Sequence, residues 1–235
     1  MSGFGEKFVH AIRRGSFCAL IVIVAMPLLV AARAGQQSFE LKLGIITSAA
    51  FNDALLGARM SLTEAQRAAQ LLGGAVSATE LVVTPSTTSD DVAEWLHKHE
   101  INATVVATDS TTLSAIAPAL TARAIPVLSV HARAGGSREF ELLPDCEVWK
   151  ATLDPFGAAQ LNARYQVANR AAMTSQAWAG WFAVKALWES ASRLRTADPD
   201  RVSEFLGSSR AQFDGHRGQL LSFDAQSRTL RVPCL

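Results

Sequence analysis

The segment from Thr104 to Arg133 constrains the fold of this chain more than any other. Residues 104–107 are mostly apolar, residues 113–124 have the composition of a helix, and residues 125–130 are again apolar. Two strands that are apolar on both faces and joined by a helix are typical of a parallel sheet, because crossover helices cover both faces. The segment therefore predicts strand, helix and strand in a parallel α/β sheet.

Polar residues follow each of these two strands. Ser110 and Thr111 come after the first strand, and His131 and Arg133 come after the second. The carboxyl ends of parallel strands meet at one edge of the sheet, where open α/β sheets bind ligands. Together with Ser48, which follows an earlier strand, these four residues are the predicted ligand contacts.

The rest of the chain continues the same pattern of strands and helices. The predicted fold is a three-layer α/β/α parallel sheet with additional late helices and a closing hairpin, in one domain from residue 35 to residue 235. The further strands are expected at 41–47, 79–83 and 139–143. The further helices are expected at 56–72, 154–168, 176–194 and 199–206, with one more helix that Ser89 caps. The hairpin is expected to pair 213–224 with 229–232.

The first 34 residues have the features of a secretory signal peptide. Three basic residues precede an apolar run at 17–30, and Ala32-Arg33-Ala34 is a small-x-small cleavage signal. The alternative is an uncleaved N-terminal anchor, which Pro27 and the cleavage signal disfavour. We therefore expect a mature protein that begins at Gly35 and resides in the periplasm.

Charge and motifs exclude several functions. Removal of the first 34 residues takes away four basic residues and one acidic residue, so the net charge falls from +1 to −2. This balance does not offer the basic surface that a nucleic acid requires. The turn at 48–51 lacks the glycines of a dinucleotide or phosphate loop. The chain is thus predicted to bind neither nucleic acid nor nucleotide.

Catalytic and metal-binding constellations are also weak. His131 could lie near Ser110 or Ser129, but the chain has no Gly-x-Ser-x-Gly elbow, so a hydrolase is not expected. His97 and His99 are two residues apart and therefore diverge on a helix, which disfavours a metal pair. We predict no catalytic residue, no metal site and no enzymatic activity.

Two cysteines remain in the mature chain, Cys146 and Cys234. In an oxidising periplasm an even pair indicates a disulfide, and two unpaired thiols are the alternative.

The helix expected at 176–194 carries Trp178, Trp181 and Trp188. A helix packed broadly on a sheet explains them more simply than an aromatic ligand box does.

Several of these segments resemble the type 1 periplasmic binding proteins, the leucine and branched-chain amino-acid-binding group of ABC transporter substrate-binding proteins. Residues 105–118, followed by 125–129, are similar to the third-strand and fourth-strand region of that family. Residues 177–187 resemble its late helix, and residues 213–224 resemble its closing segment. Residues 154–165 look most like a subgroup associated with PQQ-dependent alcohol dehydrogenase systems.

The resemblance also has a gap. Members of the family have two lobes that close on a ligand, and here only residues 134–153 stand where the sheet of the second lobe is expected. Because one βαβ unit takes about 30 residues, the resemblance implies a single lobe, made of a core at 41–133 and late elements at 154–235. A ligand would stay partly exposed on it, and a homodimer would supply the missing wall.

The family also suggests which residues contact a ligand. In the family a serine after the third strand and a small-residue and threonine pair after the fourth hold the polar head of the ligand. The matching positions here are Ser110 and Ala132-Arg133. An arginine in place of the threonine suggests an anionic ligand, such as the multi-carboxylate quinone PQQ, because guanidinium forks suit carboxylates. A solvated loop arginine is the alternative.

The resemblance implies a periplasmic solute-binding component of an ABC transporter, or a derivative of one, that is linked to PQQ-dependent alcohol oxidation and has no resident cofactor. Its partners would be a small anionic or amino-acid-like ligand and a transporter permease. The alternative is an accessory protein that docks on a periplasmic dehydrogenase or cytochrome and binds no small molecule.

Overall fold

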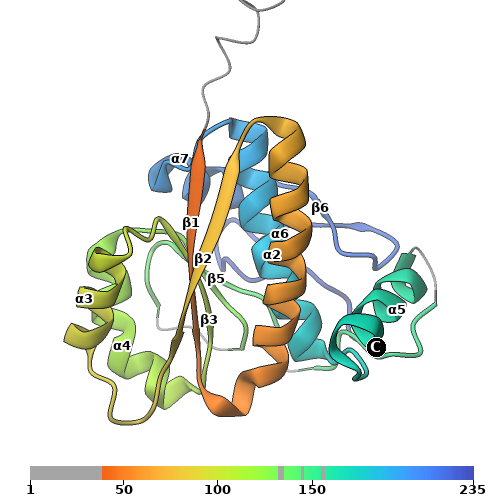
Figure 1. Cartoon of the computed structure of the whole chain (residues 1–235), viewed down its shortest axis with the longest axis horizontal. Coiled ribbons are helices and arrows are strands. Elements are labelled where there is room, and N and C mark those ends of the chain that lie inside the picture. Colours follow the sequence, from red (N-terminus) through yellow and green to blue (C-terminus); the bar gives the residue numbers. More distant parts are fainter. Residues whose placement is uncertain (1–38, 132–134, 144–145, 155–156) are drawn as a thin grey trace, which may run out of the picture. The chain divides into compact units, whose positions relative to one another are not determined.

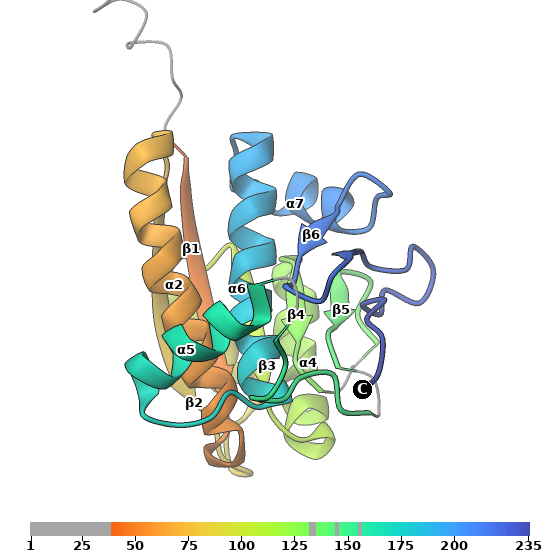
Figure 2. The same cartoon turned by 90° about the vertical axis from the view of Figure 1, so that its right-hand side faces the viewer.

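A computed structural model describes residues 39–131, 135–143, 146–154 and 157–235. The predicted signal peptide and Arg133 lie outside the described residues. Five parallel strands form one sheet in the order β2-β1-β3-β4-β5 (Figures 1 and 2). The strands are β1 (Glu40–Thr47), β2 (Ala75–Val82), β3 (Ala103–Ala107), β4 (Val127–Ser129) and β5 (Glu139–Glu141).

Helices cover both faces of this sheet, which confirms the predicted three-layer α/β/α fold. Ile45 packs in the same core as the helices α2 (Asn52–Leu72) and α6 (Ser175–Leu194). The next residue, Ile46, packs in the opposite core with α3 (Ser89–Lys98) and α4 (Ser110–Arg123). The side chains of a strand alternate between faces, so continuous apolar strands fill both cores.

Shorter elements complete the described chain. They are the 3-10 turn η1 (Ala49–Phe51), the helices α5 (Ala158–Asn169) and α7 (Pro199–Leu206), and the two-stranded ribbon of β6 (Phe213–Asp214) and β7 (Leu220–Leu221). No helix in the described part of the chain is long and apolar enough to cross a membrane.

The structure departs from the predicted element ends in four places, and at two of them a capping side chain explains the difference. The N-cap of α3 is Thr88 and not Ser89, because Thr88 and Asp91 form a reciprocal capping box. Similarly, α6 begins after Thr174, whose hydroxyl accepts from the Ala177 N–H at 3.2 Å. The helix expected from residue 154 begins at Ala158, and the strand expected at 79–83 begins at Ala75.

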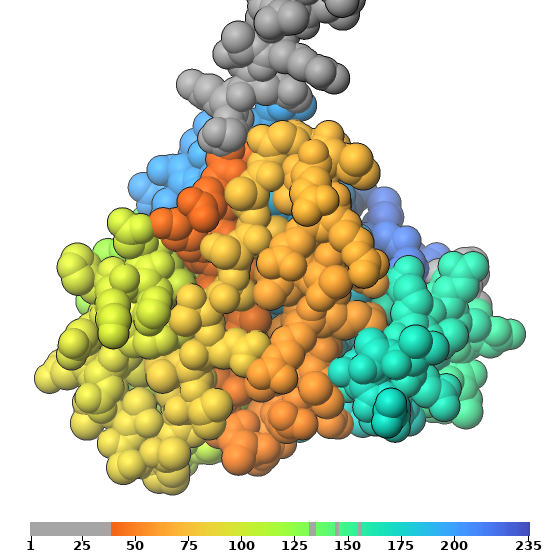
Figure 3. Space-filling model, viewed as in Figure 1, coloured from red at the N-terminus to blue at the C-terminus, as the bar shows by residue number. Residues whose placement is uncertain are grey.

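The helices α2 and α6 run in the same direction along one face of the sheet (Figure 1), and α2 lies at the surface on this side of the molecule (Figure 3). A Cβ atom on Gly57 of α2 would lie 1.8 Å from the Ala177 carbonyl oxygen, and a Cβ atom on Gly180 of α6 would lie 2.0 Å from the Ala54 carbonyl oxygen. The backbones can meet only because both positions lack a side chain.

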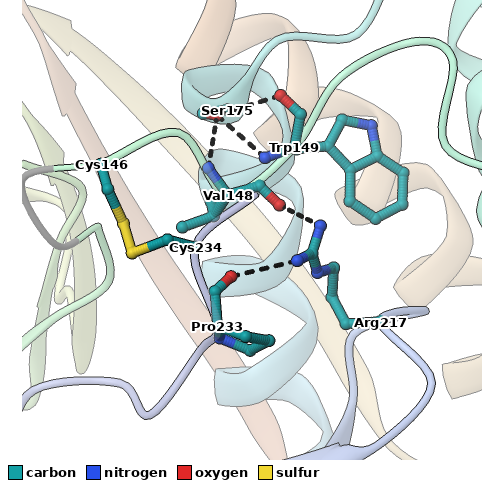
Figure 4. The surroundings of a disulfide bond; sticks show 7 residues. All are labelled: Cys146, Val148, Trp149, Ser175, Arg217, Pro233 and Cys234. Carbon is teal, nitrogen blue, oxygen red and sulfur yellow. Dashed lines mark hydrogen bonds between the residues drawn. A yellow bond between two sulfur atoms is a disulfide. The ribbon is translucent and has the colours of Figure 1, made fainter.

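The C-terminal segment is tied to the middle of the chain. A disulfide joins Cys146 to Cys234, and the guanidinium of Arg217 donates to the carbonyls of Val148 and Pro233 (Figure 4). The hairpin predicted between 213–224 and 229–232 is present only as a single bridge from Phe223 to Leu230. In the same segment, Thr229 bridges to Glu141 at the outer edge of β5.

The close contact of α2 and α6 at Gly57 and Gly180 predicts that one added methyl group lowers the stability of the protein considerably. Gly180→Ala places a methyl group within 2.0 Å of a backbone oxygen that belongs to another helix. We expect it to lower the free energy of unfolding by about 1–3 kcal/mol, the usual cost of overpacking, in a urea titration followed by circular dichroism. Gly207→Ala is the control, because its added methyl meets nothing closer than 3.8 Å. Equal stability of the two variants would contradict the close backbone contact between α2 and α6.

Candidate ligand-binding site

The register of the sheet brings three strand ends to one edge. Thr47 of β1 lies opposite Ala107 of β3, and Val106 of β3 lies opposite Ser129 of β4. The turns beyond these strands are therefore adjacent, as the backbone N–H of Ser48 shows by donating to the Ala107 carbonyl at 3.1 Å. This carboxyl edge, at the foot of the sheet in Figure 1, is where α/β sheets hold ligands.

The predicted contact residues lie at this edge in different environments. Ser110 and Thr111, in the first turn of α4, are exposed, and so is His131 beyond β4. The His131 ring lies 6.1 Å from the ring of Phe51, centroid to centroid, so the turns after β1 and β4 touch. Ser48 is half-buried, and its hydroxyl has no hydrogen-bond partner within the described chain. Three of the predicted residues thus face solvent at this edge, and one of them, His131, lies against the ring of Phe51.

Asp109 is a charged member of the edge that the sequence analysis missed. Its carboxylate caps α4 by accepting from the Thr112 N–H at 2.9 Å and from the Thr112 hydroxyl at 2.8 Å. These hydrogen bonds hold the pKa of Asp109 below its ordinary value. An aspartate directly before Ser-Thr-Thr at a helix start is the signal that would have found it. Its negative charge opposes an anion at the same edge.

A second polar group lies where α2 and α6 begin. Asp53, in the first turn of α2, accepts a hydrogen bond from the Thr174 hydroxyl at 2.9 Å. Tyr165 of α5 is fully buried, and its hydroxyl has no hydrogen-bond partner among the described residues. Burial, with a smaller contribution from the charge of Asp53, raises the pKa of Tyr165 to about 12. The sequence offered no signal for this buried phenol.

The tryptophans of α6 pack rather than line a ligand box. Trp178, Trp181 and Trp188 are exposed by 0%, 2% and 5%. The Trp178 ring stacks between Trp149 and Phe182, and the Trp181 indole donates to Glu64 at 2.9 Å. A groove of about 560 Å³ runs beside them between α2 and α6. Of the three, only Trp181 and Trp188 contribute to its wall, and both are almost fully buried, so the packing interpretation holds.

Metal ligands are not grouped in the described chain. Within these residues no three His, Cys, Asp or Glu side chains lie close enough together to hold an ion. His97 is exposed and His99 is half-buried against Trp95.

The comparisons with known proteins identify the fold. No protein-family model matches the chain, and no curated protein sequence matches it. Among solved structures, a solute-binding protein of an ABC transporter from R. palustris, in complex with benzoate, matches with a TM-score of 0.65 at 9% identity, over 79% of this chain and 89% of that one. A possible leucine/isoleucine/valine-binding protein from Rhodopirellula baltica matches with a TM-score of 0.59 at 10% identity, over 83% and 92%.

A leucine-binding protein from Thermotoga maritima matches with a TM-score of 0.57 at 10% identity, over 78% of this chain and 91% of that one. The chain therefore has the α/β fold of the type 1 periplasmic binding proteins, and its structural neighbours are solute-binding proteins of ABC transporters. At 9–10% identity the likeness shows the fold and assigns no role to a residue.

Tyr165 predicts a pH dependence that one chromophore reports, since it is the only tyrosine in the chain. Its folded pKa of about 12 lies above the value near 10 of an unfolded chain. The stability that depends on the neutral phenol is complete below pH 10 and is lost as the pH rises from 10 to 12. We expect a loss on the order of 2 kcal/mol and no tyrosinate absorbance at 295 nm from the native protein at pH 10.5.

Tyr165→Phe should abolish that pH dependence and cost little stability at pH 7, because the hydroxyl it removes has no partner among the described residues. Native Tyr165 that titrates near pH 10 would show that the phenol is hydrated.

Proposed function

We propose that this chain is a periplasmic solute-binding-like protein, either the substrate-binding component of an ABC transporter or a derivative of one, with no enzymatic role. The observation that supports this most is the exposure of Ser110, Thr111 and His131 at adjacent strand ends. They lie in a fold whose neighbours include a protein solved with benzoate and a leucine-binding protein. The exposed hydroxyl groups of Ser110 and Thr111 and the imidazole of His131 offer polar contacts for a small ligand.

The charges at the edge separate two kinds of ligand. Asp109 and Asp53 bring negative charge to the described part of the edge. An anionic ligand would therefore depend on Arg133, which belongs to the same turn as His131 in the sequence. An amino-acid-like ligand could use both signs, with its ammonium group near Asp109 and its carboxylate at Arg133. We favour an amino-acid-like ligand because its ammonium group would use the negative charge of Asp109.

Only one side of a ligand would be covered by this edge. Within the described residues one five-stranded parallel sheet is present, with a two-stranded ribbon beside the later helices. Small ligands are usually buried by about 70–90%, so we propose that a second copy or the transporter itself covers the exposed side.

We propose the link to PQQ-dependent alcohol oxidation on narrower grounds. The segment that resembles that subgroup continues into α5, which exposes Val167 by 84%. An exposed apolar side chain there suits the alternative role, in which the protein docks on a periplasmic dehydrogenase or cytochrome. Docking would be favoured over solute binding if the mature protein retains such a partner in a pull-down and no small ligand raises its melting temperature.

Two substitutions test the ligand class. In a calorimetric panel of amino acids, dicarboxylates and PQQ, Arg133→Ala should weaken the best ligand by roughly tenfold or more, because it removes a charge-assisted hydrogen bond. Asp109→Asn keeps the helix cap. It should weaken an amino-acid-like ligand by a similar factor and strengthen a purely anionic one.

The matched control is Glu204→Gln, an exposed carboxylate on α7, which lies at the other end of the sheet (Figure 1). It should leave every affinity unchanged. If neither Arg133→Ala nor Asp109→Asn alters the affinity of any ligand that binds, the carboxyl edge is not the site.

A further inference from the structure

The two outer strands of the sheet have different surroundings. β5, at one edge, has three residues, and Thr229 of the C-terminal segment bridges to its Glu141. β2, at the other edge, has eight residues, and within the described part of the chain it pairs only with β1. Figure 3 shows β2 at the surface of the molecule, between α2 and α3. The sheet is thus closed by the C-terminal segment at β5 and accessible at β2.

The backbone of β2 presents a row of hydrogen-bonding groups at this edge. The N–H groups of Ala75 and Val83 donate to the carbonyls of Phe39 and Thr47 on the β1 side, both at 2.8 Å. Alternate residues of a strand bond to opposite sides, so the even-numbered residues of 76–82 direct their N–H and C=O groups away from β1. Among the described residues these outward groups have no hydrogen-bond partner. Such a row is a template for another strand.

β2 also lacks the features that keep an edge strand from pairing. Natural edge strands are short, bulged, or interrupted by proline or lysine. β2 stays in continuous register with β1 over all eight residues and contains neither proline nor lysine. Its single charge, Glu80, accepts from the Arg59 Nε of α2 at 2.7 Å. Val82, at its end, is 61% exposed and leaves an apolar side chain in water.

A second copy of β2 fits this edge when a two-fold axis perpendicular to the sheet passes between two Thr79 residues. The two strands are then antiparallel, and α2 of one copy lies on the same side of the joined sheet as α2 of the other. Ala78 lies opposite Glu80 of the second copy, and Val76 lies opposite Val82. Every outward-directed backbone group of β2 therefore finds a partner in this register.

The side chains are also complementary in this register. Val82 packs against Val76 of the second copy, which removes its apolar surface from water. Glu80 lies opposite Ala78, whose methyl group leaves room for Arg59 beside the carboxylate. Opposed apolar pairs stabilise antiparallel strands, whereas like charges directly opposite each other destabilise them.

The neighbouring registers are less suitable. An axis at Glu80 would bring two Glu80 carboxylates opposite each other. An axis at Ala78 would place Val82 opposite Gly74 and leave its apolar side chain without a partner. The sequence of β2 therefore favours pairing with itself in one register, and a second copy is the partner that it fits.

We propose that the protein forms a homodimer through β2, with one continuous sheet across the two copies. Because the two β2 strands are antiparallel, the carboxyl edges of the two sheets point in opposite directions. This dimer therefore leaves both candidate ligand edges uncovered, and it is independent of the proposed ligand. In such a dimer, the exposed side of a bound ligand is left for the transporter to cover.

A cysteine pair on β2 tests the dimer and its register. Thr79→Cys places two thiols opposite each other, with Cα atoms about 4.5 Å apart, which is a separation that a disulfide spans. We expect most of the mature protein to run as a covalent dimer on a non-reducing gel after mild oxidation.

Ser77→Cys is the matched control, since it lies on the same face of the same strand and is more exposed than Thr79. Ser77 would lie opposite Leu81 of the second copy, about 14 Å along the strand from Ser77 of that copy. It should therefore give little covalent dimer. Equal cross-linking of the two variants, or none at Thr79→Cys, would overturn the proposal.

A proline on the free side of β2 tests the backbone pairing. Ala78→Pro removes an N–H that points away from β1, a position at which edge strands tolerate proline. In analytical ultracentrifugation, the wild-type mature protein should sediment as a dimer. Ala78→Pro should weaken the dimer by roughly tenfold or more, because each copy loses a hydrogen-bond donor.

A wild-type protein that sediments as a monomer, or a folded Ala78→Pro variant that dimerises as well as the wild type, would overturn the proposal. If circular dichroism shows that Ala78→Pro does not fold, the sedimentation of the wild type and the cysteine variants decide.

Discussion

The structure depends on the contact between the backbones of α2 and α6. Gly57 and Gly180 allow this contact, because a side chain at either position would collide with a backbone carbonyl oxygen of the other helix. The contact places α6, which comes late in the chain, over the face of β1 and β3 that α2 also covers. The core on that face is therefore completed by residues from the other end of the sequence. Without it, the early strands would keep α3 and α4 on one face and expose the apolar side chains of the other face to water.

The same contact leaves the carboxyl edge open. α6 covers a face of the sheet, and the C-terminal segment bridges to the outer edge of β5, so neither occludes Ser110, Thr111 or His131, which remain exposed. The disulfide and Arg217 hold that segment against residues 146–148. A single sheet is thereby stabilised from its faces and its side, while the ends of its strands stay available to a ligand or a partner.

Local sequence patterns predicted the sheet, the end of α2 at residue 72, the start of α7 at residue 199, and the strand ends that carry the candidate site. These features depend on apolar runs and on capping chemistry, which are local. Asp109 and Tyr165 were missed for different reasons. An aspartate directly before Ser-Thr-Thr is a local signal for the cap of α4, whereas the buried phenol depends on how α5 packs near Asp53, which no local pattern contains. The Gly57 and Gly180 contact is equally non-local.

The proposed function requires the carboxyl edge of this sheet to be the surface that binds a ligand. Backbone amide NMR of the mature chain, titrated with amino acids, dicarboxylates, benzoate and PQQ, reports on that edge residue by residue. A ligand is expected to shift the amides of Ser110, Thr111 and His131 together. Saturable shifts confined to the groove between α2 and α6, or a panel that shifts no amide at this edge, would contradict it.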